Sequence, residues 1–153
     1  MSSNYIDLEM HYLQKCLVIA KTANKNYIPQ PRGAILVQQG EILATGFDNP
    51  ATGEYAELMA LNKTRKNTVG ANLYVSMFFS SVWDEMHIDK LINSKIQMLV
   101  YGYNNPRLMD NKDYQQNLRK LERAGIKCIY LRIPEILTFY APYRFAEGIQ
   151  DRT

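Results

Sequence analysis

Residues 34–45 read Ala-Ile-Leu-Val-Gln-Gln-Gly-Glu-Ile-Leu-Ala-Thr, and this stretch sets the starting point of the fold. Two short apolar runs, 34–37 and 41–45, flank the polar segment Gln-Gln-Gly. Short apolar runs joined by a tight glycine-containing turn are typical of a β-hairpin. We therefore expect an antiparallel pair of strands here.

The pattern changes on both sides of this hairpin. Toward the N-terminus, apolar residues recur at helical spacing between Asn4 and Ala23, which predicts an amphipathic helix. Toward the C-terminus, apolar runs that suit buried strands alternate with amphipathic helical patterns. The predicted strands cover 73–79, 96–101 and 126–131. The predicted helices cover 54–66, 83–93, 112–124 and, in pieces because of Pro142, 134–149.

The alternation of helices and strands indicates an α/β fold. Each later strand is joined to the next by a helix, so these strands are expected to run parallel through right-handed crossovers. We predict a three-layer α/β/α sandwich around a mixed five-stranded sheet that is antiparallel only at the first hairpin. Because no repeat, linker or shift in composition interrupts the pattern, residues 1–153 are expected to form a single domain.

The composition excludes several classes of protein. Of the 153 residues, 46% are hydrophobic and 22% are charged, which is ordinary for a globular chain and excludes disorder. No apolar run is long enough to cross a membrane. The net charge of +3 is dispersed along the chain and argues against nucleic acid as a partner. The start of the chain lacks the pattern of a signal peptide. Cys16 and Cys128 form no paired motif, so we expect them to be buried free thiols in the cytoplasm.

Several segments resemble one known family when their order and spacing are taken together. Pro31-Arg-Gly-Ala-Ile-Leu-Val37 and Leu73-Tyr-Val-Ser76 resemble two of its strands. Residues 48–61 resemble the approach to its catalytic helix, and residues 93–102 and 118–127 resemble later parts. The family is the cytidine-deaminase-like superfamily, and the nearest branches are the riboflavin-biosynthesis deaminase domain and the tRNA adenosine deaminases. This resemblance implies a cytidine-deaminase-like fold over nearly the whole chain.

The chain departs from the family at the zinc ligands. The family carries His-Ala-Glu on one helix and a Pro-Cys motif followed by a second Cys near the next helix. Here Tyr55 stands in place of the histidine, Phe79-Ser80 in place of Pro-Cys, and His87 in place of the second cysteine. Only Glu57, which matches the proton-shuttling carboxylate of the family, is retained.

These replacements predict that the chain binds no zinc and needs no other cofactor. A catalytic zinc site needs three thiolate, imidazole or carboxylate ligands and an open position for water. The hydroxyl groups of Ser80 and Tyr55 stay protonated near pH 7 and are poor ligands. Without zinc there is no metal-activated hydroxide at neutral pH, so deamination by the family mechanism is not expected.

Arg32 replaces a valine that lines the pocket of the family. One interpretation is an arginine at a strand start that reaches solvent, and another is a guanidinium that replaces the lost metal charge beside Glu57. On the second interpretation Arg32 and Glu57 form a buried ion pair and Tyr55 fills the volume of the metal. Glu57 has its own structural interpretation, as a first-turn carboxylate favoured by the helix dipole. The candidate pocket consists of Arg32, Asn49, Tyr55, Glu57, Ser80 and His87.

Two functions remain open from the sequence. The first is a zinc-less pseudo-deaminase that binds a small nucleobase-like ligand or serves as a structural subunit of a homo-oligomer or of a partner assembly. Clustered tyrosines, among them Tyr101, Tyr103, Tyr130 and Tyr140, are interpreted as interface residues. The second is an active enzyme on a riboflavin-pathway, purine or pyrimidine intermediate, with a rebuilt site in which Glu57 and His87 act as an acid/base pair.

Overall fold

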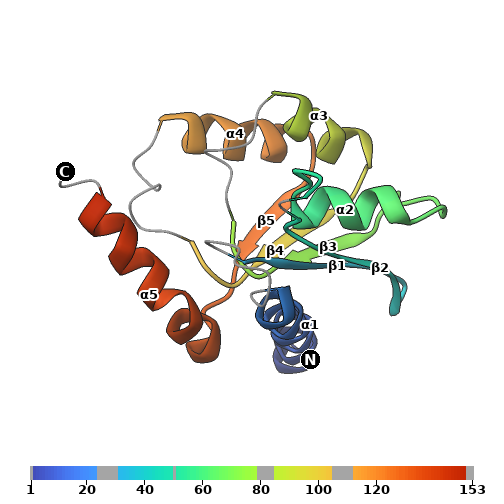
Figure 1. Cartoon of the computed structure of the whole chain (residues 1–153). Coiled ribbons are helices and arrows are strands. Elements are labelled where there is room, and N and C mark those ends of the chain that lie inside the picture. Colours follow the sequence, from blue (N-terminus) through green and yellow to red (C-terminus); the bar gives the residue numbers. More distant parts are fainter. Residues whose placement is uncertain (1, 24–30, 50, 79–84, 105–111, 151–153) are drawn as a thin grey trace.

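The computed structural model describes residues 2–23, 31–49, 51–78, 85–104 and 112–150, and its elements alternate as the sequence predicts (Figure 1). The strands are β1 (Gly33–Gln38), β2 (Glu41–Phe47), β3 (Asn72–Val75), β4 (Met98–Tyr101) and β5 (Lys127–Tyr130). The helices are α1 (Ser2–Ala23), α2 (Ala56–Lys63), α3 (Glu85–Asn93), α4 (Lys112–Arg123) and α5 (Pro134–Gln150).

The five strands form one mixed sheet in the order β2-β1-β3-β4-β5. The pairs β3–β4 and β4–β5 are parallel, as expected, and β1–β2 is the expected antiparallel hairpin. However, β1 also pairs with β3 in antiparallel orientation, so the expectation that only the hairpin is antiparallel is wrong. The reason lies in burial: five of the six residues of β1 are buried, which suits an inner strand, whereas β2 is largely exposed and lies at the edge.

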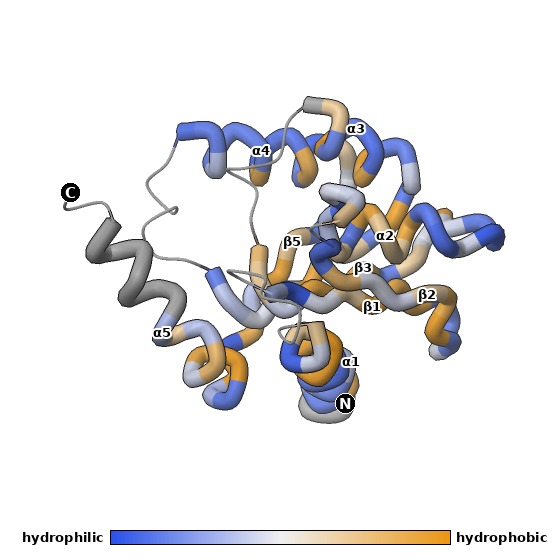
Figure 2. Tube along the Cα trace, viewed as in Figure 1, coloured by the Kyte–Doolittle hydropathy of each residue, from blue (hydrophilic) through white to orange (hydrophobic). Residues whose placement is uncertain are grey.

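Helices cover both faces of the sheet and give the predicted three layers. Figure 1 shows α2, α3 and α4 on one face and α1 and α5 on the other. Each face has its own apolar core: Leu73 and Leu99 belong to the first, and Tyr74 and Val100 to the second. Side chains that are adjacent along β3 and β4 thus point to opposite cores, as the pleat of a strand requires. Figure 2 shows the apolar strands in the middle layer and the hydrophilic α4 outside them.

The largest differences from the predicted elements are in α5 and β3. Helix α5 runs without a break through Pro142, so the prediction of a helix in pieces is wrong. A proline removes one hydrogen bond of a helix, and the bonds around it can hold the helix together. Strand β3 ends at Val75, earlier than predicted, and Phe78 makes only an isolated bridge to Asn104.

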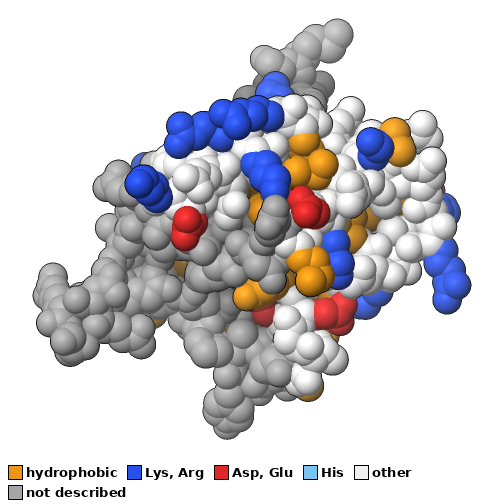
Figure 3. Space-filling view, turned by 90° about the horizontal axis from the view of Figure 1, so that it is seen from above, with side chains coloured by type: hydrophobic (Ala, Val, Ile, Leu, Met, Phe, Trp, Pro, Cys, Tyr) orange, Lys and Arg blue, Asp and Glu red, His pale blue; other side chains and the backbone are white. Residues whose placement is uncertain are grey.

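The outer surface mixes charges of both signs. Seen from above, Lys and Arg side chains lie among Asp and Glu on the face that carries the helices α2 to α4 (Figure 3). One pair, Lys120 with Asp89 at 3.4 Å, links α4 to α3. Among the described residues, no helix has the length and apolar character needed to cross a membrane.

The tyrosine clusters are not the interface that the sequence predicts. Tyr101, Tyr103 and Tyr140 are 5%, 4% and 0% exposed, so they fill the core, and only Tyr130 is exposed, at 42%. The expected burial of the cysteines holds for Cys16, while Cys128 is half-buried, and both are free thiols.

Candidate functional site

The site begins where the chain enters β1. Gly33 lies so close to α1 that a Cβ there would be 2.2 Å from the carbonyl oxygen of Cys16, so only glycine fits. The backbone of Gly33 is held from the other side by Ser76, whose hydroxyl accepts a hydrogen bond from the Gly33 N–H at 3.0 Å. These contacts fix the preceding residue, Arg32, at the carboxyl end of β3.

Arg32 is 1% exposed, and its guanidinium group donates hydrogen bonds to three residues. Its Nε and Nη2 donate to the two carboxylate oxygens of Asp48 at 2.9 and 3.0 Å, which is a bidentate pair. Nη2 also donates to Glu57 Oε1 at 3.0 Å, and Nη1 donates to the carbonyl oxygen of Met77 at 3.0 Å. The buried ion pair between Arg32 and Glu57 that the sequence predicts is therefore confirmed.

Glu57 lies in the first turn of α2 and is completely buried. Its Oε1 is 3.0 Å from Nε2 of His87, which comes from α3 and is 3% exposed. The Tyr55 ring lies against both Arg32 and His87, with its centroid 5.5 Å from Cζ of Arg32 and 5.0 Å from the centroid of the His87 ring. One carboxylate oxygen thus faces a guanidinium and an imidazole under an aromatic ring.

The surroundings keep Glu57 and Arg32 ionised. Burial alone raises the pKa of Glu57, but the Arg32 charge and the contact with His87 outweigh it and lower the pKa to about 2. Burial alone lowers the pKa of Arg32, but Asp48 and Glu57 reverse this effect and hold the pKa above its ordinary value. The site is therefore a paired ionic cluster rather than a titrating acid.

A second network braces the same loop from α5. The Tyr140 hydroxyl donates to the carbonyl oxygen of Pro31 at 2.7 Å and lies 2.7 Å from the hydroxyl of Ser76. Burial raises the pKa of Tyr140, so its hydroxyl keeps its proton. Helix α5 is thus tied to the backbone on both sides of Arg32.

The structure gathers four of the six predicted pocket residues: Arg32, Tyr55, Glu57 and His87. Asn49 uses its side chain in the turn before α2, where its Oδ1 accepts from the N–H of Ala51 at 3.0 Å. Its backbone N–H donates to the carbonyl oxygen of Glu54 at 2.9 Å, so these hydrogen bonds of Asn49 lie in the turn rather than in the cluster. Ser80 lies outside the described residues.

Sequence reasoning missed Asp48. Its Oδ1 accepts from the N–H of Ala56 at 2.8 Å, so it caps α2 in addition to holding Arg32. Tyr55 occupies the N-cap position of α2 but makes no side-chain cap. An acidic residue shortly before a helix that lacks a capping residue of its own is the signal that could have identified Asp48.

The donors in the site do not fit a zinc ion of the kind that the resemblance implies. Glu57 Oε1 is already bound by Arg32, and a guanidinium 3.0 Å from that carboxylate repels a second cation. The imidazole of His87 is the remaining good ligand beside a tyrosine phenol. Across the described ranges, no group of three or more His, Cys, Asp or Glu residues could hold a metal ion.

Comparison with known proteins gives sequence relatives of one kind. RibD, a riboflavin biosynthesis protein of Aquifex aeolicus, is 30% identical over 125 residues, which are 79% of this chain and 34% of RibD. PYRD, the chloroplastic riboflavin biosynthesis protein of maize, is 28% identical over 122 residues, 77% of this chain and 30% of PYRD. The chain spans about a third of the length of the curated relatives that it matches. No family model matches the sequence.

Solved structures have the same fold. A diaminohydroxyphosphoribosylaminopyrimidine deaminase/5-amino-6-(5-phosphoribosylamino)uracil reductase from Thermotoga maritima superposes with a TM-score of 0.75 at 24% identity, over 92% of this chain and 42% of that one. The dCMP deaminase of cyanophage S-TIM5, in complex with dCMP and dUMP, has a TM-score of 0.59 at 17% identity, over 82% of this chain and 97% of that one. This chain therefore has the cytidine-deaminase-like α/β fold, and its sequence relatives are riboflavin biosynthesis proteins.

Proposed function

We propose that this chain is a zinc-less pseudo-deaminase, which binds a small nucleobase-like ligand or acts as a structural subunit. One observation carries the proposal: the buried guanidinium of Arg32 lies 3.0 Å from the carboxylate of Glu57, the residue that matches the family's proton shuttle. A buried carboxylate needs a positive partner, and the guanidinium supplies the charge that a metal ion supplies in the family.

The protonation state of Glu57 supports the same proposal. A general acid/base works best when its pKa is near the working pH, so that it can both accept and release a proton. The pKa of Glu57 is lowered to about 2, by Arg32 and His87 against the effect of burial. A carboxylate held ionised in this way is a weak base and a poor proton carrier at neutral pH.

The ligand and assembly parts of the proposal rest on the fold and on the surface. The related dCMP deaminase of cyanophage S-TIM5 was solved with dCMP and dUMP, so the fold can bind a pyrimidine nucleotide. Apolar side chains remain exposed at Val18, on α1, and at Ile42, on the edge strand β2, and they suit contact with a second copy or a partner subunit. Two free thiols are consistent with the cytoplasm as the proposed location.

The test is metal analysis of the purified protein together with an ammonia-release assay. We expect well below one zinc per chain and no ammonia from cytidine, dCMP, guanine or a 2,5-diaminopyrimidine ribotide. The matched variants are His87→Ala, in the site, and His11→Ala, an exposed histidine on α1. Stoichiometric zinc that is lost in His87→Ala and kept in His11→Ala would overturn the pseudo-deaminase proposal.

The contact between His87 and Glu57 favours a second candidate, an active enzyme with a rebuilt site. Nε2 of His87 and Oε1 of Glu57 are 3.0 Å apart, which is within the reach of a proton transfer. In this case a riboflavin-pathway, purine or pyrimidine intermediate would be the substrate, and the imidazole would move the proton. Metal-independent ammonia release that is abolished in His87→Ala and unchanged in His11→Ala would establish this candidate in place of the first.

A further inference from the structure

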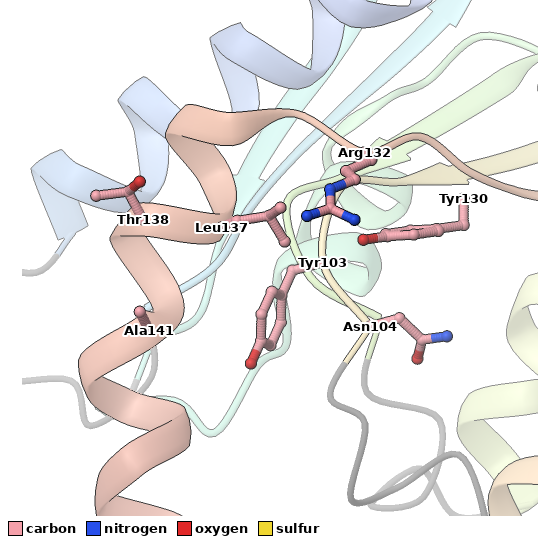
Figure 4. A pocket seen from close by; sticks show the side chains of 7 residues that line it. All are labelled: Tyr103, Asn104, Tyr130, Arg132, Leu137, Thr138 and Ala141. Atoms are coloured by element: carbon pink, nitrogen blue, oxygen red, sulfur yellow. The ribbon is translucent and has the colours of Figure 1, made fainter.

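A pocket separate from the Glu57 cluster opens at the carboxyl ends of β4 and β5. Its volume is about 470 Å³, within the range of small-molecule sites. The residues that line it come from three segments: Tyr103 and Asn104 after β4, Tyr130 and Arg132 at the end of β5, and Leu137, Thr138 and Ala141 on α5 (Figure 4). In parallel sheets this edge is where ligands bind, because loops from adjacent strand ends diverge there.

The lining combines one cation with aromatic surface. Figure 4 shows the side chains of Arg132, Tyr130 and Leu137 directed toward one another between the strand ends and α5. Arg132 is exposed, and within the described part of the chain no carboxylate forms an ion pair with it. A guanidinium that no carboxylate of the described residues pairs with, beside a cavity, is suited to bind a phosphate or carboxylate through two N–H groups.

The tyrosines make the rest of the pocket suitable for a flat ring. Tyr130 is 42% exposed and packs against Tyr101 with ring centroids 5.7 Å apart, which holds its ring in place. Tyr103 is 4% exposed and is supported by Tyr140 on α5, with centroids 5.1 Å apart. Asn104 is also held, because its Oδ1 accepts from the Tyr114 hydroxyl at 2.6 Å. Rigid aromatic walls lower the entropy cost of binding a ring.

We propose that this pocket binds a small molecule in which a flat aromatic ring is joined to an anionic group. The anionic group contacts Arg132, and the ring lies against Tyr130 and Leu137. The proposal does not depend on the function of the Glu57 cluster, because Arg32 and Glu57 are enclosed by their own contacts and line no part of this pocket. The two places share one support, Tyr140, which contacts Tyr103 and also hydrogen-bonds Pro31.

The experiment is a calorimetric titration with three probes: AMP, adenosine and inorganic phosphate. AMP carries both a ring and a phosphate, so it should bind more tightly than either of the other two. Equal affinity for AMP and phosphate would show that the pocket recognises only the anionic group and not the ring. Equal affinity for AMP and adenosine would show that Arg132 has no role in binding. Either result, or no binding of AMP at 10 mM, roughly the weakest affinity such titrations resolve, would overturn the proposal.

Two variants and one control locate the binding. Arg132→Met should weaken the binding of AMP by about tenfold to a hundredfold, the usual effect of losing a charge-assisted hydrogen bond. Ala141→Trp should fill the pocket from α5 and block AMP while leaving Arg132 in place. Arg123→Met removes another exposed arginine, at the end of α4, and should bind AMP as the unchanged protein does. An equal loss of affinity for AMP in Arg123→Met would mean that AMP binding depends only on the overall charge of the protein, and the proposal would fail.

NMR separates this proposal from the proposed function. In the amide spectrum of the labelled protein, AMP should shift the signals of Tyr103, Tyr130, Arg132 and Leu137. Shifts centred instead on Arg32, Glu57 and His87 would place the ligand in the Glu57 cluster. That result would overturn the present inference and would leave the proposal of a nucleobase-binding pseudo-deaminase standing.

Discussion

Two buried carboxylates, Glu57 and Glu9, lie on opposite faces of the sheet and have pKa values shifted in opposite directions. Glu57, in the first turn of α2, is 0% exposed and has a guanidinium and an imidazole within 3.0 Å. Glu9, on α1, is 3% exposed. Its burial is opposed only in part by a hydrogen bond with Tyr74, which lowers its pKa. The pKa of Glu57 is lowered to about 2, whereas burial raises the pKa of Glu9 above its ordinary value.

The difference shows that burial alone does not decide the charge of an acid. Desolvation opposes ionisation at both positions, and only at Glu57 does a fixed cation overcome it. A cation is itself costly to bury, so Arg32 needs Asp48 as well as Glu57. The Glu57 cluster is thus a set of groups that depend on one another, while Glu9 is a single group in an apolar layer.

Removing the central cation should have the largest effect. Arg32→Met leaves Glu57 and Asp48 without their shared partner, and we expect a loss of about 3–5 kcal/mol in the free energy of unfolding. The measurement is a urea titration followed by circular dichroism, with Arg123→Met as the control. The exposed control should change stability by about 0.5 kcal/mol or less.

A double-mutant cycle checks whether this loss comes from the pair. In Arg32→Met/Glu57→Gln no charge of the pair remains, so the double variant should lose less than the sum of the single variants. Additive losses would show that Arg32 and Glu57 stabilise the fold independently, contrary to the 3.0 Å contact between them.

The decrease in stability at acid pH should depend on the ion pair of Glu57. Because its folded-state pKa is lowered from an ordinary value near 4.5 to about 2, its contribution is fully present above pH 4.5. This contribution is lost as the pH falls from about 4.5 through 2. Glu57→Gln should therefore flatten the decrease in stability over this window, measured by thermal melts at each pH. An unchanged acid limb in Glu57→Gln would mean that other carboxylates produce it.

Much of the fold could be predicted from the sequence, because local patterns carry it. The apolar runs around Leu73 and Leu99 and the helical spacing before Ala23 placed the strands and the first helix correctly. The position of β1 inside the sheet could not be derived in this way, since strand order is decided by pairing between distant segments.

The site was predictable in part for a different reason, the resemblance to the deaminase family. A retained Glu57 without a metal requires a positive partner, and an arginine in an apolar strand start, Arg32, is the natural one. Asp48 was missed because an aspartate in a turn is explained by the turn itself. The pocket beside Arg132 was missed because its residues are dispersed over three segments, and only the fold brings them together.

Removing Asp48, the second anion that Arg32 contacts, should lower the free energy of unfolding less than removing Arg32 does. Asp48→Ala removes two hydrogen bonds to Arg32 and the bond that caps Ala56, but it leaves Glu57 paired. We expect a loss of about 1–3 kcal/mol in the free energy of unfolding. Asp89→Ala is the control, because its exposed pair with Lys120 should contribute about 0–1 kcal/mol. A loss in Asp48→Ala no larger than in the control would remove Asp48 from the cluster.

The smallest effect, and one of opposite sign, is expected at Glu9. Its Oε2 has no hydrogen-bond partner among the described residues, and burial raises its pKa above the ordinary value near 4.5. The native state therefore holds this proton more tightly than the unfolded chain does. As the pH rises from 4.5 through the folded-state pKa, the carboxyl must ionise in the apolar layer and stability decreases.

Glu9→Gln keeps the shape of the side chain and a group that Tyr74 can hydrogen-bond, but it has no charge to bury. We expect it to stabilise the protein at pH 7 by about 1 kcal/mol or less and to have little effect near pH 4.5. Asp7→Asn is the control on the same helix, since Asp7 is exposed and its replacement should change stability equally little at both pH values. Urea titrations at the two pH values measure the difference. If Glu9→Gln destabilised the protein at pH 7, as Arg32→Met should, Glu9 would have a cationic partner after all, and the contrast between the two faces of the sheet would disappear.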